Sequence, residues 1–346
     1  MLRTLKILQV IDQLGVGGAE RVAIDVTNLL FETNVNVSFL ALLTKSNQDN
    51  NLHKDIPRFY LNRASKLNLK SLFRLRSILK GFDIIHVHMR HNFRYVNLVN
   101  KLFCLNVKVI LHDHYGSIQI NKSVPSFLNT FLKPKYYIGV SKDLTDWAHT
   151  ALGLKKNIYL LQNTIIKQKH QKYKNPQGLV ILGNIKPVKN QLFAIELAHH
   201  LKKHLTIIGK IQDQKYYKLL QQKIQELDFE SKITFIHDEN NPQKKINDFE
   251  IGLMTSSSES GPLVLVEYLA QSLPFISYNT GAVSSILAVE LPNSFVNSFE
   301  MTEWQKRLDT ISDLQIDYES LYETYFSPSN YSQQCIVIYK DILKNY

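Results

Sequence analysis

Two glutamates in the second half of the chain are spaced so that both could bind one polar ligand. Glu259 and Glu267 stand in the segment SSSESGPLVLVE, residues 256–267. Eight residues correspond to just over two helical turns, so the two carboxylates can address a ligand from the same side. Glu267 lies among valines and leucines, where an idle carboxylate is costly. We therefore expect a binding role for both, and the alternative is an acidic helix cap with one solvated glutamate.

The loop between the glutamates offers backbone N–H groups that suit a phosphate. Ser260, Gly261 and Leu263 lie where this loop passes into the following apolar helix. The first amides of a helix have no partner within it, and they bind anions well. Pro262, at the first turn, removes only a donor that the helix does not need. The segment therefore predicts a diphosphate at the helix start, with hydroxyl groups of the same ligand on the two carboxylates.

A glycine-rich loop near the beginning of the chain has the features of a second phosphate contact. The sequence GVGGAER, residues 15–21, follows the apolar run at 6–11 and precedes a helical pattern. Glycines let the backbone turn tightly and approach a ligand, and the amides of the helix start then face that ligand. The third glycine of a dinucleotide-binding fingerprint is missing. Gly17 and Gly18 are therefore candidate ligand contacts, and a plain tight turn is the alternative.

Strand-like and helix-like segments alternate along the whole chain, as in α/β proteins. One series ends near residue 165, and a second begins after the lysine-rich stretch 167–175. The alternation predicts two doubly wound α/β domains, whose ligands bind at the carboxyl ends of parallel strands. The expected strands are 6–11, 36–43, 83–87, 107–111, 136–140, 160–162, 179–182, 205–208, 233–235, 249–254 and 274–277, and the expected helices are 19–31, 67–79, 190–202, 216–226, 262–271 and 331–345.

Taken in order, these motifs resemble the retaining glycosyltransferase family 4 of the GT-B fold. Three further segments fit the order of that family: GVS at 139–141, QNT at 162–164 and LGNIKPVKN at 182–190. The resemblance implies two Rossmann-like doubly wound domains that face each other across a cleft. It places an N-terminal acceptor-side domain at 1–165 and a nucleotide-sugar-binding domain at 166–325. A C-terminal helix, 326–346, is then expected to pack back on the first domain.

The resemblance also implies an activity, the transfer of a hexosyl group from a nucleoside diphosphate sugar to an acceptor hydroxyl. Lys189 matches the lysine that neutralises the donor diphosphate, Glu259 is assigned to the donor sugar, and Glu267 is assigned to the ribose. The donor is expected to be a UDP- or GDP-sugar, and no metal or other cofactor is expected. The remaining donor contacts implied by the family's motifs are Gly17, Gly18, Asn163, Lys186, Ser260, Gly261 and Leu263.

One position departs from the family's pattern. Asn184 stands where the family usually has an arginine, and Lys186 is our candidate replacement because a lysine can meet phosphate as a point charge. The departure keeps open the alternative of a catalytically degenerate partner subunit. A non-hydrolysing nucleotide-sugar epimerase, an enzyme class with the same fold, is the other alternative.

Histidines stand at the expected ends of two strands in the first domain, in LHDHYG at 111–116 and HVHMR at 86–90. The resemblance places a histidine near the transferred sugar. His112 is our catalytic candidate and His114 is second, because His112 follows its strand directly. Such a histidine can hydrogen-bond a sugar hydroxyl and support the developing positive charge through its backbone carbonyl. Either His-x-His pair could bind a metal, but neither has a clear third ligand in the sequence. For His88 and Arg90 we favour packing over contact with an acceptor.

The charge of the chain is one-sided. Residues 1–165 contain 22 Lys and Arg against 10 Asp and Glu, whereas residues 166–346 contain 19 against 20. A basic half attracts anionic partners. The segment 66–80, with five basic residues and an aliphatic stripe, resembles a helix that lies on an anionic membrane, and the alternative is a helix that covers a sheet. Nucleic acid is not expected as a partner, because neither aromatic–basic interleaving nor zinc-finger spacing is present.

The sequence contains no apolar run long enough to span a bilayer and no signal-peptide pattern. Cys104 and Cys335 lie far apart, which suits a reducing compartment. We therefore expect a cytoplasmic enzyme, in peripheral contact with the inner face of the cell membrane. Its expected acceptor is a saccharide or lipid-linked saccharide, in the assembly of a bacterial cell-surface polysaccharide.

Overall fold

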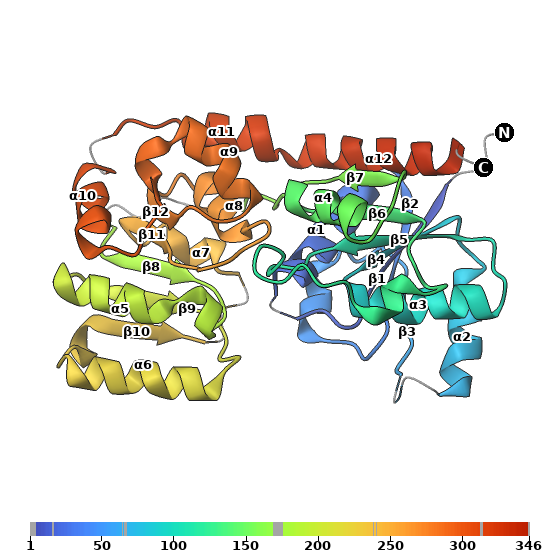
Figure 1. The fold of residues 1–346 in the computed structure, drawn as a ribbon, viewed down its shortest axis with the longest axis horizontal. Helices are drawn as coiled ribbons and strands as arrows, with labels where there is room; N and C mark the ends of the chain where they lie inside the picture. The colour runs from blue at the N-terminus through green and yellow to red at the C-terminus, as the bar shows by residue number, and fades with distance from the viewer. Residues whose placement is uncertain are drawn as a thin grey trace. The chain divides into compact units, whose positions relative to one another are not determined.

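The structure is a computed structural model that describes residues 5–15, 17–63, 65, 68–168, 176–237, 239, 241–311 and 314–344. The chain divides into two compact units, one made of Met1–Ile165 with Pro328–Tyr346 and the other of Ile166–Ser327. Each unit is a parallel sheet with helices packed on it (Figure 1). Within the described ranges, no helix is both long enough and apolar enough to cross a membrane.

The first unit contains a seven-stranded sheet in the order β3-β2-β1-β4-β5-β6-β7. Its strands are β1 (Lys6–Ile11), β2 (Asn36–Ala41), β3 (Arg58–Tyr60), β4 (Ile84–His88), β5 (Lys108–Asp113), β6 (Tyr136–Gly139) and β7 (Ile158–Leu160). Its helices are α1 (Gly18–Glu32), α2 (Leu69–Leu79), α3 (Arg90–Leu102), α4 (Lys142–Thr150) and α12 (Pro328–Lys344). The strand order reverses between β1 and β4, which is the switch point of a doubly wound sheet.

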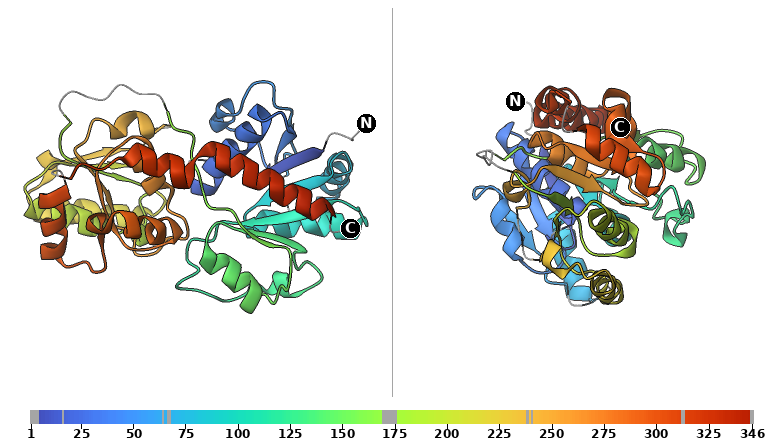
Figure 2. Two further views of the ribbon diagram at one scale, coloured as in Figure 1. Left: turned by 90° about the horizontal axis from the view of Figure 1, so that it is seen from above. Right: turned by 90° about the vertical axis from the view of Figure 1, so that its left-hand side faces the viewer.

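The two faces of this sheet differ in polarity. Leu8 and Val87 belong to an apolar cluster that includes residues of α2, α3 and α4. Because successive side chains of a strand point to opposite faces, Gln9 and His86 lie on the other face. There they meet Tyr339 of α12, to which both are hydrogen-bonded. Figure 2 shows α12, in red, lying along the first unit.

The second unit contains a six-stranded sheet in the order β10-β9-β8-β11-β12-β13. Its strands are β8 (Leu179–Leu182), β9 (Leu205–Ile208), β10 (Ile233–Ile236), β11 (Ile251–Met254), β12 (Phe275–Tyr278) and β13 (Phe295–Val296). Its helices are α5 (Gln191–His200), α6 (Gln214–Glu226), α7 (Gln243–Ile246), α8 (Leu263–Ala270), α9 (Ala282–Glu290), α10 (Met301–Ile311) and α11 (Tyr318–Phe326). The switch point of this sheet lies between β8 and β11.

The expected α/β class is confirmed, and most expected elements are present within a few residues of their expected bounds. The strand expected at 160–162 is wrong by two residues, since β7 is Ile158–Leu160. Helix α2 begins at Leu69; Lys66 and Leu67 of the basic segment, and 169–175 of the lysine-rich stretch, lie outside the described residues. Helix α2 buries Leu72, Leu75 and Leu79 and so covers the sheet, while Leu69 and Phe73 are exposed.

Helix α8 packs closely on β11, and this contact predicts a sensitive position. A β-carbon at Gly252 would lie 2.6 Å from the ring of Tyr268, which is completely buried and donates its hydroxyl hydrogen to the Leu253 carbonyl at 3.1 Å. Gly252→Ala should therefore lower the free energy of unfolding of the second unit by about 1–3 kcal/mol, measured by urea titration. Gly116→Ala is the control, because nothing lies within 4 Å of the added carbon. Equal stability of the two variants would contradict this packing.

Candidate functional site

The carboxyl ends of β8 and β11 lie side by side at the switch point of the second sheet. Lys189 ends the short turn Pro187–Lys189 that follows β8, and Glu259 lies in the loop that follows β11. In doubly wound sheets this is the place where ligands bind. The predicted lysine and glutamate are therefore both brought to the position that the topology favours for a ligand.

Lys189 and Glu259 form an ion pair. The Nζ atom of Lys189 lies 2.5 Å from Oε1 of Glu259, and the two side chains are 20% and 15% exposed. Gly183, with φ +151°, makes room for this pair, since a β-carbon there would lie 3.3 Å from Cε of Lys189. The pair places an ammonium group, which suits phosphate, next to a carboxylate, which suits hydroxyl groups.

Backbone contacts fix the two loops that carry this pair. The hydroxyl of Thr255 donates to the Lys189 carbonyl at 2.9 Å, and the N–H of Ser257 donates to the Val188 carbonyl at 2.9 Å. Gly281, with φ +86°, allows close approach from the loop after β12, since a β-carbon there would lie 3.0 Å from the Glu259 carbonyl oxygen. The geometry of the pair is therefore set by the ends of three neighbouring strands.

Glu267 lies within α8 and is 9% exposed. The expectation that Pro262 occupies the first turn is wrong, because the helix begins at Leu263 and Pro262 precedes it in an extended conformation with ψ 103°. Only 263–267 of the segment from Glu259 to Glu267 is helical. The spacing of two helical turns therefore does not relate the two carboxylates, and the loop sets their arrangement instead.

The predicted amide donors lie at the start of α8. Ser260 is 7% exposed, and its carbonyl accepts from the N–H of Ala282 at 2.8 Å, which ties the loop to the start of α9. Gly261 is half-buried and stands directly before Pro262, and Leu263 is the first helical residue. Their contact with a donor phosphate stays a prediction.

Asn184 has a structural role at the position where the family usually has arginine. Its Oδ1 atom accepts from the N–H of Lys210 at 3.3 Å, and its carbonyl accepts from Nε2 of Gln191 at 3.1 Å. The side chain thereby joins the loop after β8 to the loop after β9. Lys186 is half-buried and directly precedes the turn that ends in Lys189. One loop therefore carries both lysines.

The glycine loop is shaped by a carboxylate. Gly17 caps the N-terminus of α1 with φ −105°, and Gly18 is the first helical residue. Gly17 therefore has a backbone conformation that any residue adopts, and its φ does not require a glycine. A β-carbon at Gly17 would overlap the carboxylate of Glu20, which folds back against the loop. Val16 lies outside the described residues.

Asn163, the remaining predicted donor contact, is 6% exposed. It follows β7 and lies shortly before Ile166, where the second unit begins.

Four histidines gather at the carboxyl ends of β4 and β5, where His88 and His112 are in register. The centroids of the His88 and His112 rings lie 5.1 Å apart, and those of His112 and His114 lie 4.2 Å apart. His86, His88 and His112 are completely buried, and His114 is half-buried. Nε2 of His86 lies 2.9 Å from Nδ1 of His112, and Nδ1 of His88 lies 3.1 Å from Nε2 of His114. Two motifs that are separate in the sequence thus form one cluster.

Burial keeps these four rings neutral. It lowers the pKa of His86 and of His114 to about 3, and it holds the pKa of His88 and of His112 well below the usual range. Nε2 of His112 is buried and meets no hydrogen-bond partner among the described residues. This nitrogen is the atom of His112 that fits the predicted contact with a sugar.

The cluster corrects the expectation that neither His-x-His pair has a third ligand. His86, His88 and His112 each place one ring nitrogen within 4.8 Å of the others, because β4 and β5 are neighbours. Neutral imidazole nitrogens are common ligands of Zn²⁺. Both nitrogens of His86 and of His88 already take part in hydrogen bonds, so a metal ion would have to replace these bonds.

Arg90, which follows β4, forms an ion pair with Asp113, which ends β5; their side chains are 12% and 1% exposed. Nη2 of Arg90 lies 2.7 Å from Oδ2 of Asp113, and the hydroxyl of Tyr137 donates to the same oxygen at 2.8 Å. The guanidinium group lies over the rings of Trp147, at 4.1 Å, and Tyr115, at 4.4 Å. These contacts show how Arg90 packs within the first unit.

The backbone at Met89 is strained, with φ 72° and ψ 143°, a region that residues other than glycine rarely adopt. Its N–H donates to the His112 carbonyl at 2.9 Å, which holds the ends of β4 and β5 together. This bond engages the same carbonyl that was assigned to the developing positive charge. Strain of this kind concentrates at functional sites, which agrees with a site at these strand ends.

The neutral histidines should make the first unit sensitive to acid. These rings titrate near pH 6.5 in an unfolded chain, whereas the folded pKa of His86 and of His114 is about 3. Between these values the unfolded chain binds more protons, so stability falls as the pH falls, by about 1.4 kcal/mol per pH unit for each ring. We expect the melting temperature of this unit to drop steeply from about pH 7 to about pH 5. His114→Asn should make that decline shallower, and a constant melting temperature would contradict the burial of the cluster.

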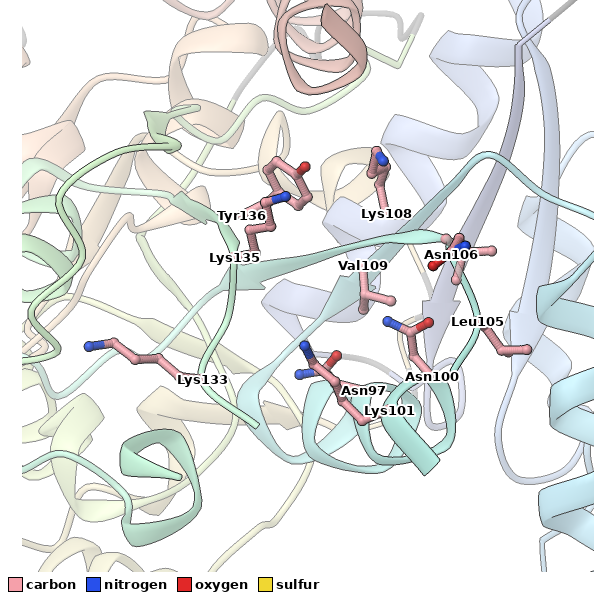
Figure 3. Close-up of a pocket in the computed structure, with 11 residues that line it drawn as sticks. Asn97, Asn100, Lys101, Leu105, Asn106, Lys108, Val109, Lys133, Lys135 and Tyr136 are labelled. Carbon is pink, nitrogen blue, oxygen red and sulfur yellow. The ribbon is translucent and has the colours of Figure 1, made fainter. Parts of the chain in front are cut away.

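A pocket of about 350 Å³ lies at the opposite, amino-terminal ends of β5 and β6 (Figure 3). Lys108 begins β5 and Tyr136 begins β6. Amide and basic side chains from α3 line the pocket together with residues of β5 and of the segments that precede the two strands. The predicted site residues of the first unit lie at the carboxyl ends of the strands or after them. This pocket therefore does not belong to the candidate site.

Comparison with known families decides the identity of the chain. Residues 16–168 match the family described as Glycosyltransferase Family 4, and residues 162–325 match the Glycosyl transferases group 1. The two matches together span 16–325. The chain belongs to the group 1 and family 4 glycosyltransferases. No curated protein matches the sequence of this glycosyltransferase in a direct search.

Solved structures share the fold of this glycosyltransferase at low sequence identity. Anabaena Alr3699/HepE, in complex with UDP and glucose, is 16% identical with a TM-score of 0.77, over 97% of this chain and 99% of that one. A glycosyltransferase from Rickettsia africae is 16% identical with a TM-score of 0.76, over 99% and 100%. A mutant of S. aureus TarM, in complex with fondaparinux, α-GlcNAc-glycerol and UDP, is 10% identical with a TM-score of 0.75, over 96% and 99%. The glycosyltransferase thus has the two-domain α/β GT-B fold.

The site region of the glycosyltransferase includes residues that the sequence did not single out. Gln9 and Tyr339 are hydrogen-bonded to the histidine cluster, Glu20 lies against Gly17, and Thr255 joins two loops. Gln9 is a completely buried amide within an apolar strand. A polar residue in such a run was the one signal available, because burying it is costly without a partner.

Proposed function

We propose that this glycosyltransferase moves a hexosyl group from a nucleoside diphosphate sugar to an acceptor hydroxyl, with retention of the anomeric configuration and without a metal ion. The Lys189–Glu259 pair, 2.5 Å apart at the switch point of the second sheet, is the observation that carries this proposal. It supplies one group for the departing diphosphate and one for the sugar hydroxyls. Retention follows from the family resemblance.

Electrostatic stabilisation of the leaving group is the main catalytic effect in this proposal. Negative charge develops on the diphosphate as the glycosidic bond breaks, and a preorganised cation lowers the energy of that charge. When the donor binds, Lys189 pairs with the diphosphate instead of with Glu259. Lys186, in the same loop, adds a second positive charge. The amide of Leu263 completes the contacts. Glu259, released from the lysine, accepts hydrogen bonds from the sugar hydroxyls.

The other assignments follow from burial and from the partners of each group. Glu267, nearly buried in α8, accepts hydrogen bonds from the ribose hydroxyls. The departing diphosphate takes the proton of the acceptor hydroxyl. Asp113 does not serve as the base, because Arg90 and Tyr137 already engage its carboxylate.

A UDP-sugar is favoured over a GDP-sugar, because the Anabaena and S. aureus structures both contain UDP. The proposed acceptor is a saccharide or a lipid-linked saccharide, as in the assembly of a bacterial cell-surface polysaccharide. The exposed Leu69 and Phe73 of α2 stand next to Lys70 and Arg74, and apolar side chains beside basic ones suit peripheral contact with an anionic membrane.

Glu267→Ala should abolish the rise in melting temperature that UDP produces, because the ribose then loses its carboxylate partner. The measurement is a thermal melt of the full chain with and without UDP, repeated in excess chelator to test the metal-free proposal. Glu226→Ala, which removes a carboxylate from the surface of α6, is the matched control. A full UDP response in Glu267→Ala, or its loss in chelator with the wild-type chain, would count against the proposal.

A further inference from the structure

A chain of hydrogen bonds runs from the C-terminal helix to His112. Nε2 of Gln9 donates to the hydroxyl oxygen of Tyr339 at 2.9 Å. That hydroxyl lies 2.6 Å from Nδ1 of His86, and Nε2 of His86 lies 2.9 Å from Nδ1 of His112. Gln9, His86, His112 and Tyr339 are all completely buried. Water therefore does not compete for these bonds.

Because each group is neutral, the roles of donor and acceptor along this series of hydrogen bonds can be assigned. Burial lowers the pKa of His86 to about 3, lowers the pKa of His112 and raises the pKa of Tyr339, so each ring keeps one N–H and the phenol keeps its proton. The Tyr339 oxygen already accepts from Gln9, and its proton goes to Nδ1 of His86, a stronger acceptor than Sγ of Cys335, the other group that interacts with this hydroxyl. His86 then donates from Nε2 to Nδ1 of His112. The proton of His112 must therefore be on Nε2.

The end of this chain is a donor with no acceptor. Nε2 of His112 is buried and has no partner among the described residues. A buried donor without a partner is costly, and such groups in native structures call for a specific reason. Contact with a ligand oxygen supplies that reason. The nearest ring is that of His114, at 4.2 Å between centroids, and it is less buried than His112.

We propose that Tyr339 and His86 are positioning residues, which hold His112 in the tautomer that carries its proton on Nε2. His112 then presents an N–H donor to an oxygen of the transferred sugar. This inference rests on the proposed function and on the contact between His112 and the transferred sugar that the family resemblance implies. It gives α12 a part in the reaction, because a side chain that lies 253 residues from His86 in the sequence sets the protonation of the site.

The tautomer can be measured without any activity. The full chain is labelled with ¹⁵N in its histidine rings, and the signals of His112 are assigned from their loss in His112→Gln. We expect Nε2 of His112 to be protonated and Nδ1 to be bare in the wild-type chain. Tyr339→Phe should shift His112 toward a mixture of both tautomers. Tyr331→Phe is the matched control, because its hydroxyl lies buried on the same helix and has no partner among the described residues.

Measurements of kcat and KM test whether this tautomer serves the reaction. Tyr339→Phe should lower kcat at least tenfold and change KM for the nucleotide sugar less than twofold, whereas Tyr331→Phe should keep both values. Both variants should keep the UDP-induced rise in melting temperature. A bare Nε2 in the wild-type chain, an unchanged tautomer in Tyr339→Phe, or an unchanged kcat despite a changed tautomer would overturn the inference. A chain that transfers no sugar but shows the expected tautomer would overturn the proposed function instead.

Discussion

Lys189→Ala is expected to lower kcat by roughly 100- to 1000-fold, the effect of removing one preorganised group from a developing negative charge. The lysine lies at the switch point and is only 20% exposed, so its charge is felt strongly by a diphosphate. The measurement is the initial rate of transfer at saturating nucleotide sugar. The binding of UDP should weaken in the same variant.

Lys203→Ala is the control for this prediction. Lys203 also forms an ion pair in the second unit, with Glu250 at 2.8 Å, but both side chains are more exposed, at 43% and 39%. Lys203→Ala removes one positive charge from the second unit, as Lys189→Ala does, but it does so away from the switch point. It should therefore leave kcat unchanged. Equal rates for Lys189→Ala and the wild-type chain would remove Lys189 from the mechanism.

Glu259→Gln separates the two halves of the ion pair. Glu259 competes with a phosphate for Lys189, so its neutralisation should leave the affinity for UDP unchanged or raise it. The transfer rate should nevertheless fall, because the sugar hydroxyls lose a charged acceptor. Loss of UDP affinity in Glu259→Gln, as in Lys189→Ala, would show that both residues bind the diphosphate and would contradict the assignment of Glu259 to the sugar.

The sheets could be predicted from the sequence because buried parallel strands are almost continuously apolar. The runs KILQVI and LVIL have the bounds of β1 and β8 residue for residue. Helix α3 could not be predicted in the same way, because its buried residues include Asn92, Asn97 and Asn100 and interrupt the apolar periodicity.

The candidate site was predictable residue by residue but not in its pairings. The order of the motifs identified both Lys189 and Glu259 as candidates. Their ion pair, however, joins residues 70 positions apart and depends on β8 and β11 being neighbours. The histidine motifs were visible separately, and the register of His88 with His112 joined them. Tyr339 gave no signal, because its environment is created only when α12 packs on the first unit.

His112→Ala is expected to lower kcat by about 100-fold, because an N–H donor aimed at a sugar oxygen is lost from a site where charge develops. His114→Ala is the informative comparison, since His114 is the neighbour on the same strand end and our second candidate. It should lower kcat by less than about fivefold, as expected for a residue that only packs against His112. Rates of transfer at saturating donor decide between the two.

A second substitution at His112 tests whether the N–H donor itself is what the reaction requires. His112→Gln places an amide N–H close to the position of Nε2 and should restore part of the rate that His112→Ala loses. Both variants should keep the UDP response, because the ribose and diphosphate contacts assigned to Glu267 and Lys189 belong to the other unit. If His114→Ala were the more damaging variant, the contact with the sugar would belong to His114. His112 would then act through its neighbours, and the buried hydrogen-bond chain from Tyr339 would serve the stability of the first unit rather than the reaction.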